Sequence, residues 1–158
     1  MARKIMMQEL ISPEAIVAGL EASGKKQLLQ DFAGFAAPQA ALDPLAVFDV
    51  LWEREKLGTT GVGSGIAIPH GKLVGLDQVQ GFFARLAQPI AFEAVDDKPV
   101  DLVFLLLAPA EAGADHLHAL ATVSRLLRDP LLCEAIRRAK DASAIYRLLT
   151  ETPTAQAA

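Results

Sequence analysis

The segment Val100-Asp-Leu-Val-Phe-Leu-Leu-Leu107 decides the fold of this chain. Every side chain in it except Asp101 is apolar, whereas a strand with one face in water alternates apolar and polar residues. We therefore predict a β-strand whose two faces are both covered. In a chain that also contains helices, such a strand belongs in a sheet with helices packed against it.

The segments on either side of this strand carry helix and strand signals in mixed order. They predict an α/β fold: a single-domain sandwich in which a mixed β-sheet is flanked by helices on both sides. The predicted domain covers residues 1–150, and residues 151–158, which lack an apolar face, are predicted to form a flexible tail. Further strands are predicted at residues 15–20, 66–68, 79–87 and 90–92, and helices at 24–37, 44–57, 116–127, 130–136 and 142–149.

Short polar residues mark the predicted helix starts. Ser23, Asp43 and Asp115 can each cap a helix, because their side-chain oxygens accept hydrogen bonds from free N–H groups of the first turn. Asp129 followed by proline marks a further start. Pro38 is predicted to stop the first helix, because it lacks a backbone N–H.

The composition excludes several classes of protein. The chain has 158 residues, of which 52% are hydrophobic, and its net charge of −4 without long Lys/Arg runs argues against nucleic acid as the main partner. Its one cysteine, Cys133, excludes a disulfide or a Cys-based zinc site within one chain, and a buried inert thiol is expected. No apolar stretch is long enough to cross a bilayer and no signal peptide is visible, so we expect a cytoplasmic protein without membrane insertion.

The most unusual stretch is Gly61-Val-Gly-Ser-Gly-Ile-Ala-Ile-Pro-His-Gly71. It is not a P-loop, because five residues rather than four separate Gly65 from Gly71, and Leu73 stands where Ser or Thr is required. It is not a dinucleotide-binding turn either, because its G-x-G-x-G pattern leads into a strand rather than a helix. A different function must explain this much bare backbone.

Glycines at alternate positions leave backbone N–H groups accessible and permit another surface to approach closely. We therefore expect Gly61, Gly63, Ser64 and Gly65 to form a loop on which a partner protein docks.

His70 is the best candidate for a reactive side chain. Pro69 restricts the backbone just before it, and Gly71 removes bulk just after it, so the imidazole is presented on a rigid stem. A histidine is partly unprotonated and nucleophilic near neutral pH, as a transient phosphoryl acceptor must be. The alternative is a turn histidine that hydrogen-bonds a nearby carbonyl.

Three other side chains are weighed as helpers of His70. With Asp115 as the cap, His116 is predicted at the first helical position, where free N–H groups attract anions. His118 lies two residues further and faces elsewhere, so at most one of this pair is expected at the site. Arg54 precedes the glycine loop and could reach a phosphate, although on the sequence alone an ordinary charged helix end explains it better.

Metal and hydrolase sites are not predicted. No spacing of the three histidines and the carboxylates resembles a ligand set, and Ser64 lacks the context of a nucleophile elbow.

Residues 54–72, 89–109 and 116–120 together resemble a known family, the enzyme IIA components of the bacterial phosphotransferase system, fructose/mannitol class. The resemblance extends from about Leu10 to Leu149 and is strongest to the stand-alone nitrogen-type branch. One difference is Ser64, where the family usually has Asn, and both side chains are small and polar.

The resemblance implies a function. His70 aligns with the phosphorylated histidine, His116 with a second active-site histidine that stabilises the phosphoryl group, and Arg54 with an arginine beside the site. It implies a phosphotransferase that accepts phosphate from the carrier HPr or its nitrogen-type relative NPr, needs no cofactor, and acts as a regulatory component. The alternatives are a stand-alone IIA of a sugar permease and a non-catalytic protein-binding module.

Overall fold

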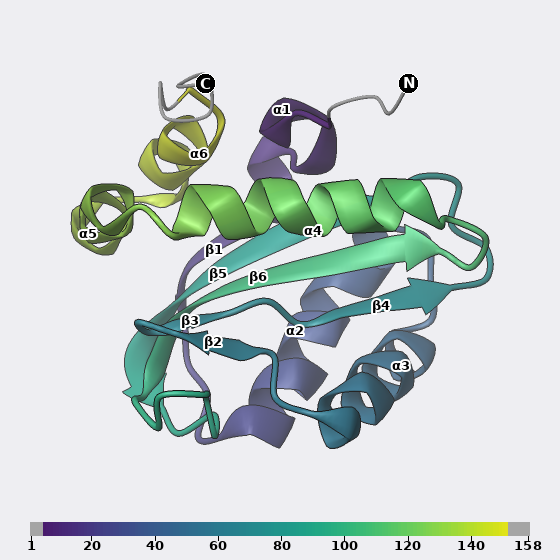
Figure 1. The fold of residues 1–158 in the computed structure, drawn as a ribbon, viewed down its shortest axis with the longest axis horizontal. Coiled ribbons are helices and arrows are strands. Elements are labelled where there is room, and N and C mark those ends of the chain that lie inside the picture. The colour runs from purple at the N-terminus through teal and green to yellow at the C-terminus, as the bar shows by residue number, and fades with distance from the viewer. Residues whose placement is uncertain (1–4, 152–158) are drawn as a thin grey trace.

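The computed structural model describes residues 5–151 as a six-stranded mixed β-sheet with helices on both of its faces (Figure 1). The strands are β1 (Ile16–Leu20), β2 (Gly61–Gly63), β3 (Ile66–Ala67), β4 (His70–Leu73), β5 (Gln80–Ile90) and β6 (Val100–Pro109). The helices are α1 (Met7–Leu10), α2 (Lys25–Gln39), α3 (Pro44–Leu57), α4 (Ala114–Leu127), α5 (Pro130–Arg138) and α6 (Ala142–Glu151), and a short 3-10 helix spans Pro13–Ala15.

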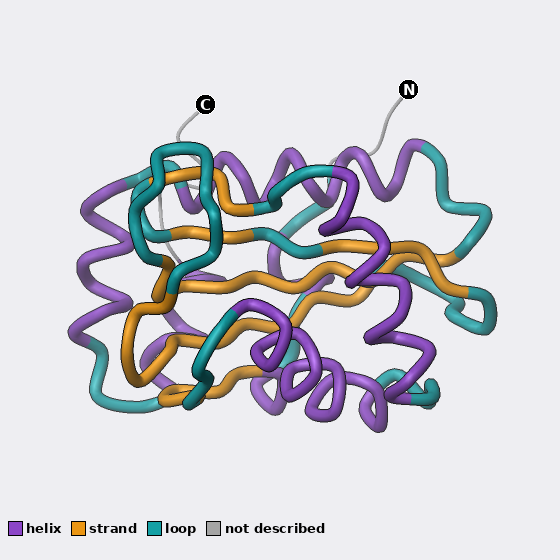
Figure 2. The backbone as a smooth tube through the Cα atoms, turned by 90° about the horizontal axis from the view of Figure 1, so that it is seen from below, coloured by secondary structure: helices purple, strands orange, loops and turns teal. Residues whose placement is uncertain are grey.

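The strand order is β1-β5-β6-β3-β2, and β4 pairs with β6 next to β3. Helices α1, α4, α5 and α6 lie on one side of the sheet and α2 and α3 on the other (Figure 1). Figure 2 shows the strands running side by side across the molecule with helices around them. The predicted fold class is therefore confirmed. Within residues 5–151, no helix is long and apolar enough to cross a membrane.

Strand β6 is the centre of the sheet, as its sequence predicted. The side chains from Leu102 to Ala108 have no exposed surface. One edge pairs antiparallel with β5, where Phe83 lies opposite Phe104, and the other edge pairs parallel with β3 and then β4. Because both faces and both edges are covered, this strand can be almost wholly apolar.

The edge of the sheet beside β6 is interrupted at Pro69, and the interruption creates the candidate site. Ile66 pairs with Leu102, and His70 pairs with Leu106 four residues further along β6. Pro69 cannot donate to the ladder, but its carbonyl accepts from the N–H of Leu106. The strand predicted at residues 66–68 is therefore followed by one that was not predicted, because pairing with β6 resumes at His70, the first residue of β4.

Helix α2 differs from its predicted ends. It runs to Gln39 with Pro38 inside its last turn, so Pro38 does not stop it. The carbonyl that Pro38 leaves without a helical donor is that of Gly34, and water can reach it because Gly34 is exposed. At the other end, Gly24 is the N-cap residue, and the Ser23 side chain hydrogen-bonds Gln27 instead of capping.

Helix α4 also begins earlier than predicted. Its first residue is Ala114 and its N-cap residue is Gly113, so Asp115 lies inside the first turn and makes no cap hydrogen bond. A carboxylate is favourable at that position through the helix dipole alone. His116 is consequently the third helical residue rather than the first. By contrast, Asp129 caps α5 as the sequence indicated, accepting from the N–H groups of Leu131 and Leu132.

Two predicted strands, at residues 79–87 and 90–92, form one strand, β5, with a register shift between Arg85 and Ile90. The irregularity, near Pro89, explains why the sequence suggested two pieces. At the C-terminal end, α6 includes Glu151, and the rest of the predicted tail, residues 152–158, lies outside the described residues.

Gly71 holds helix α3 against β4. A Cβ atom at Gly71 would lie 2.3 Å from Cγ1 of Val50, a residue of α3. No such contact is tolerated without movement, and the β-branched Val50 side chain has little freedom to rotate away within a helix. The glycine is thus required for close packing of helix on strand, not for open space around His70 as the sequence suggested.

Gly71→Ala should destabilise the protein by about 1–3 kcal/mol, because the added methyl overpacks the contact with Val50. The matched control is Gly34→Ala on the exposed side of α2, where nothing lies within 4 Å of the added carbon. That change should stabilise the protein by up to about 1 kcal/mol through helix propensity. Urea unfolding of both variants measures the difference, and equal midpoints would contradict the packing role of Gly71.

Candidate active site

His70 is half-buried at the start of β4, and its ring is fixed by one hydrogen bond. Nδ1 lies 2.8 Å from the carbonyl oxygen of Ile68. A carbonyl oxygen can only accept, so Nδ1 must carry the proton and donate. In the neutral ring, Nε2 then keeps its lone pair and is the nucleophilic nitrogen.

His116 lies beside His70. The two ring centroids are 5.5 Å apart, with the ring planes tilted by 48°. His116 is only 8% exposed, and its Nδ1 is buried without a hydrogen-bond partner among the described residues. Helix α4 therefore brings a second imidazole, through its first turn, to the ring presented by β4.

His118 is not brought to this pair. It is half-buried two residues further along α4, where a helix faces a different direction. Its Nδ1 is also buried without a partner among the described residues, but no ring contact with His70 is present there.

Both clustered histidines are held toward the neutral state. Burial is the largest influence on His70 and lowers its pKa, and the charge of Arg54 lowers it further. The bond to the Ile68 carbonyl and the charge of Glu55 both raise the pKa of His70. The net effect is a pKa below the usual value. Burial, together with the charges of His70 and Lys72, lowers the pKa of His116. Two neutral rings near pH 7 can each offer a nitrogen lone pair or an N–H group to a substrate.

Arg54 lies in the last turn of α3, and its charge acts on His70 from there. Its Nη1 donates to the carbonyl oxygen of Gly58 at 2.8 Å, which stabilises the end of its own helix. The structure thus places the guanidinium within electrostatic reach of His70, while its one hydrogen bond is to the chain's own backbone.

The glycine segment forms the β2–β3 hairpin, whose tip is in a left-handed backbone conformation. Gly63, Ser64 and Gly65 have φ angles of 105°, 59° and 84°. Ser64 is exposed, its N–H donates to Asp96 Oδ2 at 2.9 Å, and this bond contributes most to holding the pKa of Asp96 below its usual value. At the larger φ angles of Gly63 and Gly65 only glycine is free of strain, so the turn itself requires these two glycines.

The glycines of the hairpin face the chain's own residues. A Cβ atom at Gly61 would lie 2.8 Å from Cβ of Ala94, and one at Gly65 would lie 2.6 Å from Nη2 of Arg137. Arg137, from α5, also donates to the Ser64 carbonyl at 3.0 Å and pairs with Asp101. The absence of side chains in this loop therefore has an intramolecular cause, and docking of a partner on it stays a prediction.

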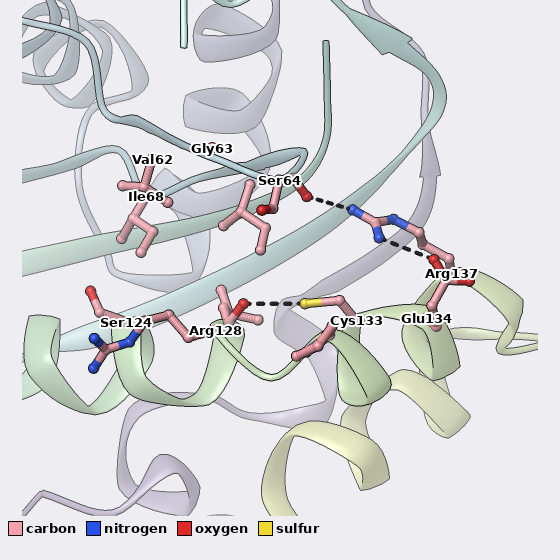
Figure 3. Close-up of a pocket in the computed structure, with 12 residues that line it drawn as sticks. Val62, Gly63, Ser64, Ile68, Ser124, Arg128, Cys133, Glu134 and Arg137 are labelled. Carbon is pink, nitrogen blue, oxygen red and sulfur yellow. Dashed lines mark hydrogen bonds and ion pairs between the residues drawn. The ribbon is translucent and has the colours of Figure 1, made fainter. Parts of the chain in front are cut away.

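A hollow of about 490 Å³ lies between this hairpin and helices α4 and α5 (Figure 3). Cys133 lines it and is buried, with its Sγ donating to the Leu127 carbonyl at 3.3 Å. Burial raises the pKa of the Cys133 thiol, as expected for an unreactive cysteine. The lining residues are Val62, Gly63, Ser64, Ile66, Ile68, Ser124, Leu127, Arg128, Pro130, Cys133, Glu134 and Arg137.

Glu55 is the residue that sequence reasoning missed. It is buried at 6% exposure, accepts from both the N–H and the hydroxyl of Thr60, and pairs with Lys25. Its position in the run Glu53-Arg-Glu-Lys56 suggested a solvated helix end. The spacing nevertheless indicates burial, because Val47, Leu51 and Glu55 follow one another at intervals of four residues and so lie on the same, buried face of the helix.

No cluster of three or more His, Cys, Asp or Glu side chains suited to a metal ion is found between residues 5 and 151. The chemistry available to the described site is that of the two imidazoles, the nearby cations and the backbone.

Known relatives match the chain over nearly its full length. It is 54% identical over 149 residues to a nitrogen regulatory protein of Bradyrhizobium diazoefficiens, covering 94% of this chain and 97% of that protein. It is 39% identical over 149 residues to the nitrogen regulatory protein of Escherichia coli K12, covering 94% of this chain and 91% of the relative.

A solved structure shows the same fold. The nitrogen regulatory protein IIA-Ntr from Neisseria meningitidis superposes with a TM-score of 0.85 at 35% sequence identity, covering 90% of this chain and 97% of the other. In addition, the family model described as "Phosphoenolpyruvate-dependent sugar phosphotransferase system, EIIA 2" matches residues 9–152. The chain therefore belongs to the EIIA type 2 family of the phosphotransferase system, among the nitrogen regulatory proteins.

Proposed function

We propose that this chain is a histidine phosphocarrier that accepts a phosphoryl group on Nε2 of His70. The observation that carries the proposal is the bond from His70 Nδ1 to the Ile68 carbonyl, which leaves Nε2 as the free nucleophile beside a second buried imidazole. The phosphotransferase family provides the reaction class. The donor we propose is an HPr- or NPr-type carrier, and the predicted cytoplasmic location is part of the same proposal.

The proposed step exchanges one phosphorus–nitrogen bond for another. The Nε2 lone pair of His70 attacks the phosphorus of a phosphohistidine on the donor, and the donor's P–N bond breaks. The bonding pair returns to the donor's ring nitrogen, and the proton on Nδ1 of His70 stays in place. As Nε2 becomes bonded to phosphorus, positive charge develops on the His70 ring, and the Ile68 carbonyl stabilises it.

The neighbours of His70 can stabilise the phosphoryl oxygens during transfer. His116 can donate from its ring, and the first-turn N–H groups of α4 receive no side-chain cap, so they are available to an anion. The charge of Arg54 adds to the same field. We propose His116 as the main stabilising donor and Arg54 as an electrostatic helper.

The proposed role of phosphorylation is regulatory. The relatives with the highest identity reported above are nitrogen regulatory proteins. A phosphoryl group adds about −1.5 to −2 charges at one point, which can favour or exclude a partner by local electrostatics. The second candidate, a IIA component serving a sugar permease, shares the chemistry and is supported by the family description. Recovery of the label on a separate permease subunit would favour it.

The three histidines should differ sharply when incubated with a phosphorylated HPr-type carrier. His70→Ala should take up no phosphate, measured by intact-protein mass. His116→Ala should be labelled about a hundredfold more slowly, because removal of one positioned donor typically has that effect. His118→Ala, the matched control on the same helix, should be labelled at the wild-type rate. Stable phosphate on the His70→Ala protein would refute the proposal.

The His70 ring should titrate below the ordinary histidine value of 6.5. A lowered pKa means that the neutral, nucleophilic ring persists to lower pH than in an exposed histidine, and acceptor activity should fall only once the pH drops below the lowered midpoint. A pH titration of the His70 ring signals by NMR measures this midpoint, with the urea-unfolded chain as the control. A folded-state midpoint at or above the unfolded one would contradict the described burial.

A further inference from the structure

A chain of hydrogen bonds connects a buried carboxylate to the ring of His70. The His70 Nδ1–H donates to the Ile68 carbonyl at 2.8 Å, and the Ile68 N–H donates to the Thr60 carbonyl at 2.9 Å. Thr60 in turn donates twice to Glu55, from its N–H at 3.0 Å and from its hydroxyl at 2.6 Å. Four residues from three different segments thus form one continuous path.

All donors in this path point the same way, from His70 toward Glu55. The N–H and the carbonyl of Ile68 belong to different peptide groups, as do those of Thr60, so this path fixes the positions of the groups, and the charge of Glu55 acts on the His70 ring through space. The path holds the Ile68 carbonyl against Nδ1 of His70, and a carbonyl oxygen can only accept, so the Nδ1–H form of the ring is favoured. The hydrogen bond that Nδ1–H donates shifts electron density from the N–H bond into the ring, which makes the opposite nitrogen, Nε2, a better nucleophile.

The surroundings hold the Glu55 side chain in place. Lys25 pairs with Glu55 at 2.9 Å and lies 4.7 Å from the centroid of the Phe92 ring. A buried ion pair of this kind contributes little net stability, and an apolar pair of the same volume often stabilises a fold equally well. The fold therefore does not by itself account for a charge at residue 55.

Glu55 also opposes two of the other influences on the pKa of His70. Burial and the charge of Arg54 both lower the pKa of His70. The neighbouring His116 ring, when neutral, adds no charge of its own beside His70. The negative charge of Glu55 acts in the other direction. A positive charge that develops on the His70 ring during phosphoryl transfer would be stabilised by the same carboxylate.

We propose that Glu55 is a positioning residue for phosphoryl transfer, which holds the reactive form of His70 through Thr60 and Ile68. This inference rests on the proposed function of His70. It assigns to the end of α3 a role that is separate from direct contact with the phosphoryl group.

Glu55→Gln tests the inference, because it removes the charge while retaining the size of the side chain. The control is Glu53→Gln, two residues earlier on α3, where an exposed carboxylate pairs with the exposed Lys56. Two measurements are made on each variant: the pH titration and tautomer of the His70 ring by ¹⁵N NMR, and the rate of phosphorylation by a phosphorylated HPr-type carrier.

Glu55→Gln should lower the His70 midpoint, weaken the preference for the Nδ1–H tautomer and slow phosphorylation by about tenfold or more, as misplacement of a reacting group does. Glu53→Gln should match wild type in both. A purely structural role for Glu55 would change stability without moving the His70 midpoint, and that result would overturn the inference.

The NMR measurement does not involve phosphate, so it separates the two proposals. An unshifted His70 ring in a folded Glu55→Gln protein refutes the role of Glu55 and leaves the phosphocarrier function standing. If Glu55→Gln does not fold, Thr60→Val carries the test, because this isosteric change removes one of the two bonds to Glu55. A phosphorylation rate of Thr60→Val within twofold of wild type would then overturn the inference.

Discussion

The interruption of the sheet edge at Pro69 is the constraint on which the site depends. Strand β6 is buried on both faces and offers one edge to two short strands in succession. Pro69, between them, contributes its carbonyl to the ladder but no donor. The Ile68 carbonyl, just before the interruption, bonds the His70 ring. The architecture of the central strand thus presents one imidazole nitrogen and engages the other.

Two helices on opposite faces of the sheet complete the site from either side. Helix α4 supplies His116 from the face that it covers, and α3 supplies Arg54 and Glu55 from the other face. Both helices are anchored to the central strands, α4 through buried residues such as Val123 and α3 through the close contact of Val50 with Gly71. A site assembled from rigid elements keeps its geometry, which suits the carrier function proposed above.

Much of this arrangement was predictable from the sequence because local patterns determine it. The apolar run at residues 100–107 predicted the buried strand, and proline next to His70 singled out that histidine. The patterns failed where a tertiary contact decides. Gly71 was expected to leave open space beside His70, yet Val50 of helix α3, far away in the sequence, occupies the space next to Gly71. The sequence also could not show that Gly61 and Gly65 face Ala94 and Arg137 of the chain itself, and docking of a partner on the hairpin stays a prediction.

Glu55 shows the same limit most clearly. A carboxylate flanked by Arg54 and Lys56 is typical of a solvated helix end, and nothing local distinguishes it. Only the folded chain brings Thr60 and Lys25 to it and excludes water. A charged residue that continues the spacing of buried apolar ones is the one hint the sequence offers.

The central claim is that Nε2 of His70 is the phosphoryl acceptor. The most direct measurement is NMR of the phosphorylated chain with ¹⁵N-labelled histidine rings, which detects the nitrogen bonded to phosphorus. The account predicts a phosphorus–nitrogen coupling at Nε2 of His70, with the proton retained on Nδ1. A coupling at Nδ1 of His70, or at a ring of His116 or His118, would contradict it.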